Sequence, residues 1–243
     1  MKSKLRVNFG FFVATLAVWC HAQAPGSPPV DKMSGWMAGT TMCLIIQGAN
    51  SDKTSPAKLP QGSGFLVSEF GYLLTNSHVV RPQTIENGGY GIFVPTQIRG
   101  TFDSDCDLNS GPSYVLEIVA FDSYADLALL KIRQNADGAR GGWRYIPRSN
   151  SNLLVKSQKL LAVGFPKGSS RIDQVGQISA LDRSQGRYET DLPLNRGYSG
   201  GPVLDLRGYV VGVVWGGRED QGGVNLFIPI NHAANLISLA GEK

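Results

Sequence analysis

The 243-residue sequence contains few of the residues that bind metals or nucleic acids. It has three cysteines and three histidines, and no second Cys or His lies at zinc-ligand spacing from Cys43 or Cys106. Lys and Arg form no stripe with interleaved aromatic residues, the usual signature of a nucleic-acid-binding face. We therefore expect no metal, no cofactor and no nucleic-acid partner, and no oligomeric state follows from the composition.

The sequence also lacks an apolar run long enough to cross a bilayer, which takes about 20 residues. The run from Phe9 to Cys20 is shorter, follows three basic residues and precedes small residues at Ala22 and Ala24. This order is typical of a secretory signal peptide cleaved after Ala24. The sequence therefore predicts a signal peptide over residues 1–24 and a secreted or periplasmic mature protein without a membrane span.

The predicted mature chain is nearly neutral and retains two cysteines. Its 20 basic residues, left after the leader removes Lys2, Lys4 and Arg6, balance 19 acidic ones. Cys43 and Cys106 would reach an oxidising compartment, which favours a disulfide between them over two free thiols. Such a bridge would tie an irregular excursion of the chain, residues 87–113, to the first strand.

Helical periodicity is missing before the C-terminal tail, residues 231–241. Short β-branched and apolar runs recur instead between turn residues, among them TTMCLIIQ, GFLVS, YVLEIVAF, LALLKI, KLLAVGF and YVVGVVWGG. Many short strands with one terminal helix predict an all-β protein, either a sandwich or barrels. The Pro- and Ser-rich residues 25–35 should be flexible, and the Gly-rich stretch 134–152 should connect two halves. The predicted organisation is a lead-in over residues 25–40 and two halves over 41–140 and 141–243.

Only two histidines, His78 and His232, lie outside the predicted signal peptide. For His232, in the predicted tail helix, a surface or capping role is the more usual one. His78 follows GSGFLVSEFGYLLTNS, a hairpin-like pair of strands with a turn at Gly71. Catalytic side chains are often held at such strand ends, although His78 by itself is equally compatible with a structural role.

Two aspartates precede the apolar strand LALLKI. Asp122 is best explained as a turn residue that caps a bend. Asp126 lies directly before the strand, among apolar residues, where a carboxylate is costly unless a partner pairs with it. A histidine that becomes cationic during a reaction is such a partner, so Asp126 is the better candidate for a catalytic acid.

The segment GYSGGP, residues 197–202, could carry a nucleophile. An activated serine needs a base, an acid that orients the base, and backbone donors for an oxyanion. Gly197 would let its own amide and that of Ser199 point to one spot, whereas Gly200 and Gly201 would allow close approach of the following strand. Taken alone, the segment is also compatible with a simple glycine turn.

Together these stretches resemble the trypsin-like serine proteases, most closely the bacterial HtrA (Deg) type. The resemblance covers residues 41–237 in the order His, Asp, Ser, through GSGFLVSEFGYLLTNSHVV, DSYADLALLKI, LAVGFPKG, VGQISAL and ETDLPLNRGYSGGPVLDLRGYVVGVV. It implies two six-stranded antiparallel β-barrels with a short C-terminal helix and an active site between the barrels. It also implies a serine endopeptidase that acts on polypeptide substrates. The implied roles are a triad of His78, Asp126 and Ser199, an oxyanion hole of Gly197 and Ser199, and a substrate-pairing strand of Val214, Trp215 and Gly216.

Three departures from the family pattern stand out. Tyr198 replaces the Asn or Asp usual before the nucleophile, which keeps open an inactive protease fold that binds peptides as a chaperone or adaptor. The unusual 87–113 excursion suggests, as another alternative, a protease specific for one target. Deg-type proteins commonly carry PDZ domains after the protease, and this sequence shows none before residue 243.

The expected specificity pocket has no acidic residue, and its apolar residues predict cleavage after apolar side chains: Pro193, Leu194, Val214, Leu226 and Ile228.

Overall fold

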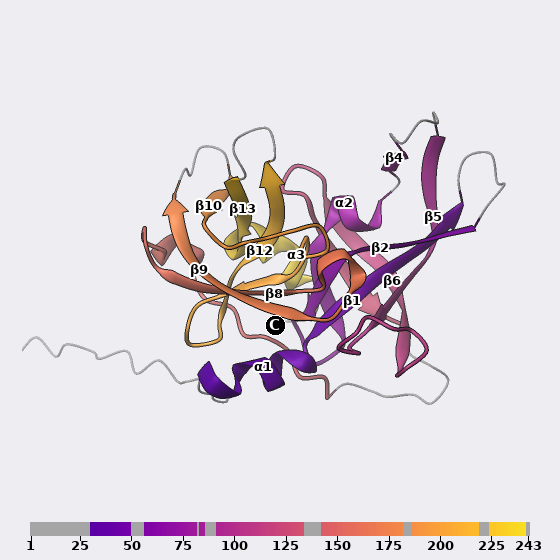
Figure 1. Cartoon of the computed structure of the whole chain (residues 1–243), viewed down its shortest axis with the longest axis horizontal. Coiled ribbons are helices and arrows are strands. Elements are labelled where there is room, and N and C mark those ends of the chain that lie inside the picture. Colours follow the sequence, from indigo (N-terminus) through magenta and orange to yellow (C-terminus); the bar gives the residue numbers. More distant parts are fainter. Residues whose placement is uncertain are drawn as a thin grey trace, which may run out of the picture.

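The computed structural model describes residues 30–49, 56–81, 83–85, 91–133, 142–181, 186–218 and 224–241. These residues form two antiparallel β-barrels that lie side by side, as Figure 1 shows. The strands of the first ring follow the order β1-β2-β3-β7-β6-β5, and pairing of β1 with β5 closes it. The second closed barrel has the order β10-β13-β12-β11-β8-β9. The predicted all-β fold with two six-stranded barrels is confirmed.

The first barrel is built mainly from hairpins. Its strands are β1 (Thr41–Ala49), β2 (Pro56–Leu66), β3 (Tyr72–Asn76), β5 (Gly91–Thr101), β6 (Ser113–Asp122) and β7 (Leu127–Ile132), and β4 (Gln83–Ile85) adds to β5 outside the ring. The turn between β2 and β3 contains Gly71 at a φ of +78°, which suits glycine. The predicted hairpin before His78 is therefore present.

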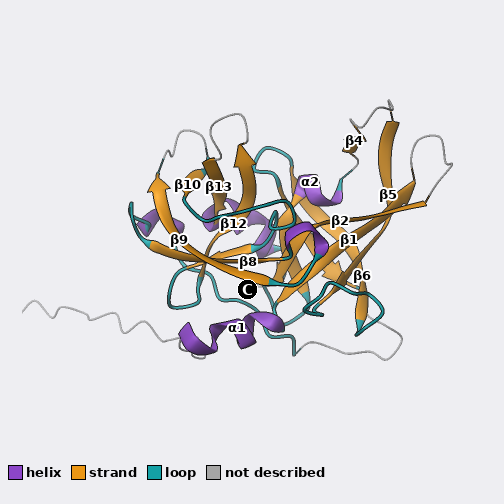
Figure 2. Ribbon diagram, viewed as in Figure 1, coloured by secondary structure: helices purple, strands orange, loops and turns teal. Residues whose placement is uncertain are grey.

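The second barrel contains the GYSGGP segment between β10 and β11. Its strands are β8 (Lys159–Gly164), β9 (Ile172–Ala180), β10 (Tyr188–Thr190), β11 (Pro202–Leu204), β12 (Val210–Arg218) and β13 (Val224–Pro229). The helices are few and short, as Figure 2 shows: α1 (Val30–Ala38), α2 (Ser77–Val80), α3 (Ala234–Ser238) and 3-10 turns at Ser151–Leu153, Pro166–Gly168 and Ile230–Ala233. The predicted C-terminal helix corresponds to the last 3-10 turn and α3, and His232 is exposed there.

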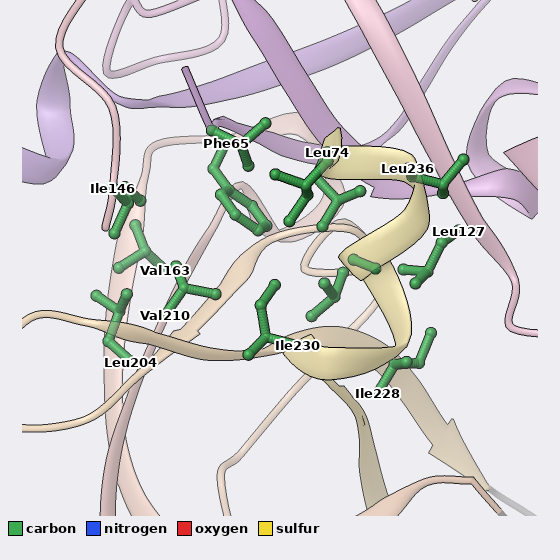
Figure 3. Close-up of a cluster of buried hydrophobic side chains, with 14 of the residues drawn as sticks. Phe65, Leu74, Leu127, Ile146, Val163, Leu204, Val210, Ile228, Ile230 and Leu236 are labelled. Carbon is green, nitrogen blue, oxygen red and sulfur yellow. The ribbon is translucent and has the colours of Figure 1, made fainter. Parts of the chain in front are cut away.

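A single apolar cluster joins the two barrels. Phe65 and Leu74 enter it from the first barrel, and Val163 and Val210 enter it from the second, as Figure 3 shows. Leu236 of α3 also belongs to it. Each fully buried aliphatic or aromatic side chain contributes about 1.5 to 3 kcal/mol relative to exposure. The cluster therefore fixes the position of one barrel against the other, on which any site between them depends.

The N-terminal segment differs from the predicted flexible lead-in over residues 25–35. From Val30 onward the chain is helical, and α1 buries Met33 and Met37, four residues apart, in the cluster between the barrels. Side chains spaced by four lie on one face of a helix, so α1 packs rather than moves freely. The predicted signal peptide lies outside the described residues. No helix in the described ranges is long and apolar enough to span a membrane.

Cys43 and Cys106 form a disulfide that links β1 to the connection between β5 and β6. The Cα atoms are 5.5 Å apart, and both cysteines are buried. The bridge packs with Ile45 and Phe165 in a small apolar cluster. Because Phe165 belongs to the second barrel, the disulfide also lies at the junction of the barrels.

Candidate active site

His78 and Asp126 are brought together by the register of two strands. β3 and β7 are antiparallel and pair Asn76 with Leu127. The residues just after Asn76 therefore face the residue just before Leu127, which is Asp126. Consistent with this register, the Ser77 backbone N–H donates to the Asp126 carbonyl at 3.1 Å.

The Asp126 carboxylate holds the imidazole of His78 in one orientation. His78 Nδ1 lies 2.6 Å from Asp126 Oδ2, and the His78 backbone N–H donates to Oδ1 at 2.9 Å. The Ser77 hydroxyl donates to the same Oδ1 at 2.8 Å. An ionised carboxylate can only accept, so Nδ1 carries the proton and the lone pair lies on Nε2. This tautomer is the one that a general base requires.

Asp126 stays ionised despite its burial. Burial opposes ionisation, but the hydrogen bond and charge of His78, together with the His78 amide and the Ser77 hydroxyl, outweigh it and lower the pKa of Asp126 below 3.8. Its backbone has a φ of +58°, a conformation that aspartate tolerates better than most residues. Asp122 instead accepts the amides of Tyr124 and Ala125, as predicted for a turn residue.

The Ser199 segment packs against the strand end that leads to His78. A Cβ added to Gly200 would overlap the Thr75 hydroxyl and lie 3.1 Å from the Asn76 nitrogen, so only glycine permits this approach. The Ser199 hydroxyl donates to the Trp215 carbonyl at 3.2 Å. The structure thus brings the predicted nucleophile, from the second barrel, next to the element of the first barrel that carries His78.

The Gly197 amide is oriented by the peptide bond before it. The Arg196 carbonyl accepts a hydrogen bond from the Lys167 amide at 2.7 Å. In a trans peptide the N–H points opposite to the C=O, so the Gly197 N–H points away from Lys167. Gly197 has a φ of +102°, and a Cβ there would overlap the Phe165 carbonyl oxygen. This position therefore requires glycine.

The Ser199 amide is oriented in the same way. The Tyr198 carbonyl accepts from the Gly201 amide at 2.8 Å, which turns the Ser199 N–H to the opposite side. Within the described part of the chain, neither the Gly197 nor the Ser199 N–H donates to a protein acceptor. Two such amides on one short loop are donors of the kind that stabilise an oxyanion.

Tyr198 does not fill the space beside these amides. Its side chain is 1% exposed and packs in the apolar core of the second barrel, against Gly164. Burial, together with the charge of Asp173, raises the pKa of Tyr198 above 10, so its ring stays neutral. The replacement of Asn or Asp by tyrosine therefore adds a core residue under the loop.

We predict that Tyr198→Phe keeps activity and that Tyr198→Ala loses stability. The hydroxyl makes at most one hydrogen bond, with the Gln174 side chain outside the Ser199 loop, whereas the ring fills the core. Loss of a buried aromatic ring costs about 3 to 5 kcal/mol of unfolding free energy. Thermal unfolding and kcat should be measured for both variants. A loss of kcat in Tyr198→Phe at unchanged stability would contradict this role.

Ser63 of β2 is a site residue that the sequence did not identify. Its hydroxyl donates to the Gly197 carbonyl at 2.7 Å and accepts from the Phe165 amide at 3.2 Å, and its own amide donates to the Ser199 carbonyl at 2.8 Å. The side chain is fully buried. Ser63 therefore fixes two carbonyls of the Ser199 loop from the other barrel.

We expect Ser63→Ala to lower kcat by about 10- to 100-fold with little change in KM, since removal of an oxyanion donor itself costs about 10²- to 10³-fold. Steady-state kinetics on a peptide substrate would test this. Ser68→Ala is the matched control, because Ser68 is also buried and its hydroxyl binds a turn amide. An equal loss of kcat in both variants, or a loss of stability alone in Ser63→Ala, would contradict a positioning role.

The predicted substrate strand lies on an open edge of β12. On this side β12 pairs with β11 as far as Val213. Val214 is also paired, because its N–H donates to the Gly201 carbonyl at 2.8 Å and its carbonyl accepts from the Gly200 amide at 2.9 Å. Beyond Val214 the described residues place no strand on that side, and a Cβ on Gly216 would lie 3.7 Å from Ser199 Oγ. An extended peptide that paired with this edge would pass beside the Ser199 hydroxyl.

The residues expected to line an apolar specificity pocket lie mostly in the cores. Leu194 and Val214 are buried in the cluster of the second barrel, and Ile228 is buried in the cluster between the barrels. Leu226 is 6% exposed, and Pro193 is exposed. These positions give no support to the predicted apolar preference, which remains a prediction.

Two β-barrels, a carboxylate-bound histidine and a serine loop with two amides that donate to no described acceptor are the architecture of the trypsin-like peptidases. Residues 62–213 match the family model of the trypsin-like peptidase domain. Since this match covers more than half of the chain, the protein belongs to the trypsin-like peptidase family.

Similar proteins of known family place the chain, within the trypsin-like peptidases, with the predicted Deg type. The chain is 33% identical over 187 residues to a probable periplasmic serine endoprotease, DegP-like, of Chlamydia trachomatis, covering 73% of the chain and 33% of the relative. It is 30% identical over 195 residues to Protease Do-like 1, chloroplastic, of Arabidopsis thaliana, covering 74% of the chain and 39% of the relative. The chain thus spans less than half the length of these relatives. The predicted resemblance to Deg-type serine proteases is confirmed.

Proposed function

We propose that the protein is a serine endopeptidase in which His78, Asp126 and Ser199 act as the catalytic triad. The observation that carries the proposal is the bond of 2.6 Å between His78 Nδ1 and Asp126 Oδ2, which places the lone pair of the imidazole on Nε2. The strand end that leads to His78 packs on the Ser199 segment. The names of two relatives, one a serine endoprotease and the other a protease, support the same activity.

In this mechanism His78 Nε2 takes the proton from Ser199 Oγ as the oxygen attacks the carbonyl carbon of the substrate. The Gly197 and Ser199 amides stabilise the negative charge that forms on the carbonyl oxygen. His78 then gives its proton to the leaving amine, so that an acyl-enzyme remains on Ser199. A water molecule, deprotonated by His78, hydrolyses the acyl-enzyme and restores the serine. Asp126 remains ionised throughout and stabilises the cationic imidazole.

The substrates we propose are polypeptides in extended form, met outside the cytoplasm. Pairing with the open edge of β12 would hold the main chain of any extended peptide, whatever its sequence. The predicted signal peptide and the name of a periplasmic relative support a secreted or periplasmic location. The alternative of an inactive peptide-binding protein rested on Tyr198, and the burial of its side chain in the core removes that reason.

Digestion of unfolded casein by the purified protein tests the activity. We expect fragments to appear with wild type and not with Ser199→Ala at the same concentration. Casein bound without cleavage would instead favour the chaperone alternative. Cleavage of a single native protein and not of casein would favour the narrow-specificity protease.

A further inference from the structure

The guanidinium of Arg187 stacks on the ring of Trp215, a residue of the predicted substrate-binding strand. Arg187 directly precedes β10, and its guanidinium carbon lies 4.2 Å from the centre of the Trp215 ring. The carbonyl of the same Trp215 accepts the hydroxyl of Ser199. The positive charge of Arg187 therefore lies over Trp215, which contacts the proposed nucleophile Ser199.

This charge has no acidic partner in the described part of the chain. No carboxylate there forms an ion pair with Arg187, and its Nε is buried without a hydrogen-bond partner. Elsewhere on the surface Arg207 pairs with Asp205, and Arg133 pairs with Glu117. A partly buried guanidinium without acceptors is unfavourable, and stacking on an aromatic ring compensates for only part of that cost.

An acidic side chain of a bound peptide would complete the pairing. A strand added to the open edge of β12 directs alternate side chains to the same face, so one of them meets the Trp215 ring and Arg187. Trp215 is only partly buried, and its inner part packs on the cluster between the barrels. The ring therefore has a fixed position, which also fixes the guanidinium that stacks on it.

We propose that Arg187 selects substrates with Asp or Glu at the position that packs on Trp215. This position lies roughly two to four residues before the cleaved bond, given a rise of about 3.3 Å per residue along a strand. The inference rests on the proposed function, because it assumes that a peptide pairs with the edge of β12 beyond Val214. The proposal adds a substrate class to the proposed function: peptides with an acidic side chain near the cleaved bond. Pairing of a peptide with the edge of β12 does not by itself specify this class.

A scan of one peptide tests the proposal. Glu and Gln are placed in turn at each of the five residues before the cut, and kcat/KM is compared within each pair. We expect Glu to be favoured about two- to fivefold at one of the second to fourth positions, as for a partly exposed ion pair. The preference should disappear in Arg187→Gln, persist in Arg187→Lys, and shift from Glu to Lys in Arg187→Glu. Arg144→Gln, which removes an exposed charge from the segment that connects β7 to β8, should change nothing.

Binding separates this proposal from the catalytic one. Affinities of the same Glu and Gln peptides for Ser199→Ala, measured by fluorescence anisotropy, should show the same two- to fivefold difference. A protein that binds with this preference but never cleaves would overturn the catalytic proposal alone. Equal affinity and equal kcat/KM for Glu and Gln at every position, a preference retained by Arg187→Gln, or no peptide binding at all would overturn the role of Arg187.

Discussion

Ser199→Ala should abolish covalent labelling by a fluorophosphonate probe and lower kcat by about 10⁴- to 10⁶-fold. Such probes react with a serine whose hydroxyl is deprotonated by a neighbouring base, and the variant has no hydroxyl. Residues of a triad act as a unit, so His78→Ala should cost nearly as much as Ser199→Ala, and the double variant little more. Gel fluorescence after labelling and single-turnover kinetics measure both effects.

The labelling experiment has a control within the chain. Ser68 is a buried serine of the same barrel as His78, and Ser68→Ala should label like wild type. Labelling that survives Ser199→Ala would mean that another residue is the nucleophile. Full labelling of His78→Ala would mean that His78 is not the base.

Asp126→Asn should reduce kcat by about 10³- to 10⁴-fold while the fold is kept. An asparagine amide can donate to His78 Nδ1, which would move the imidazole proton to Nε2 and leave no lone pair for the serine. Asp122→Asn is the matched control, because Asp122 only caps a turn. A small effect of Asp126→Asn on kcat would show that His78 keeps its tautomer without the carboxylate.

The same substitution should change the acid sensitivity of the fold. The pKa of Asp126 is lowered in the folded protein, so the carboxylate adds stability above its unfolded pKa of about 3.9, and that stability is lost as pH falls through the lower folded value. Thermal unfolding between pH 5 and pH 2.5 should therefore fall less steeply in Asp126→Asn than in wild type. Parallel curves would contradict the lowered pKa.

The barrels and the candidate triad could be predicted because their signals are local. The sequence of β7 is a short apolar run directly preceded by Asp126, and His78 directly follows a hairpin pattern. Both residues can therefore be identified from a few neighbouring residues. The glycines around Ser199 are equally visible. These positions require glycine because their backbone lies close to other residues, as Gly200 does to the Thr75 hydroxyl. The sequence alone does not predict which residues these are.

The residues that the sequence did not identify act over long distances in the chain. Ser63 contacts Gly197 across 134 positions, and neither residue shows a local pattern that predicts the partner. Arg187 meets Trp215 only because β10 and β12 flank β13 in the closed barrel. The sequence did not predict α1 because the segment is rich in Pro and Ser, a composition typical of flexible chain. Only the spacing of Met33 and Met37, four residues apart, indicates a helix face that is buried.

The contact between Ser63 and the Ser199 loop also sets an order of events during synthesis. A ribosome completes the first barrel before the loop exists, and domains and subdomains tend to fold as they emerge. The loop can reach its final shape only when it docks on β2, after the strands β11 to β13 have closed the second barrel. A nascent chain should thus remain without hydrolytic capacity until strands β11 to β13 have left the ribosome and paired, so that it does not cleave itself or its neighbours while the second barrel is unfolded.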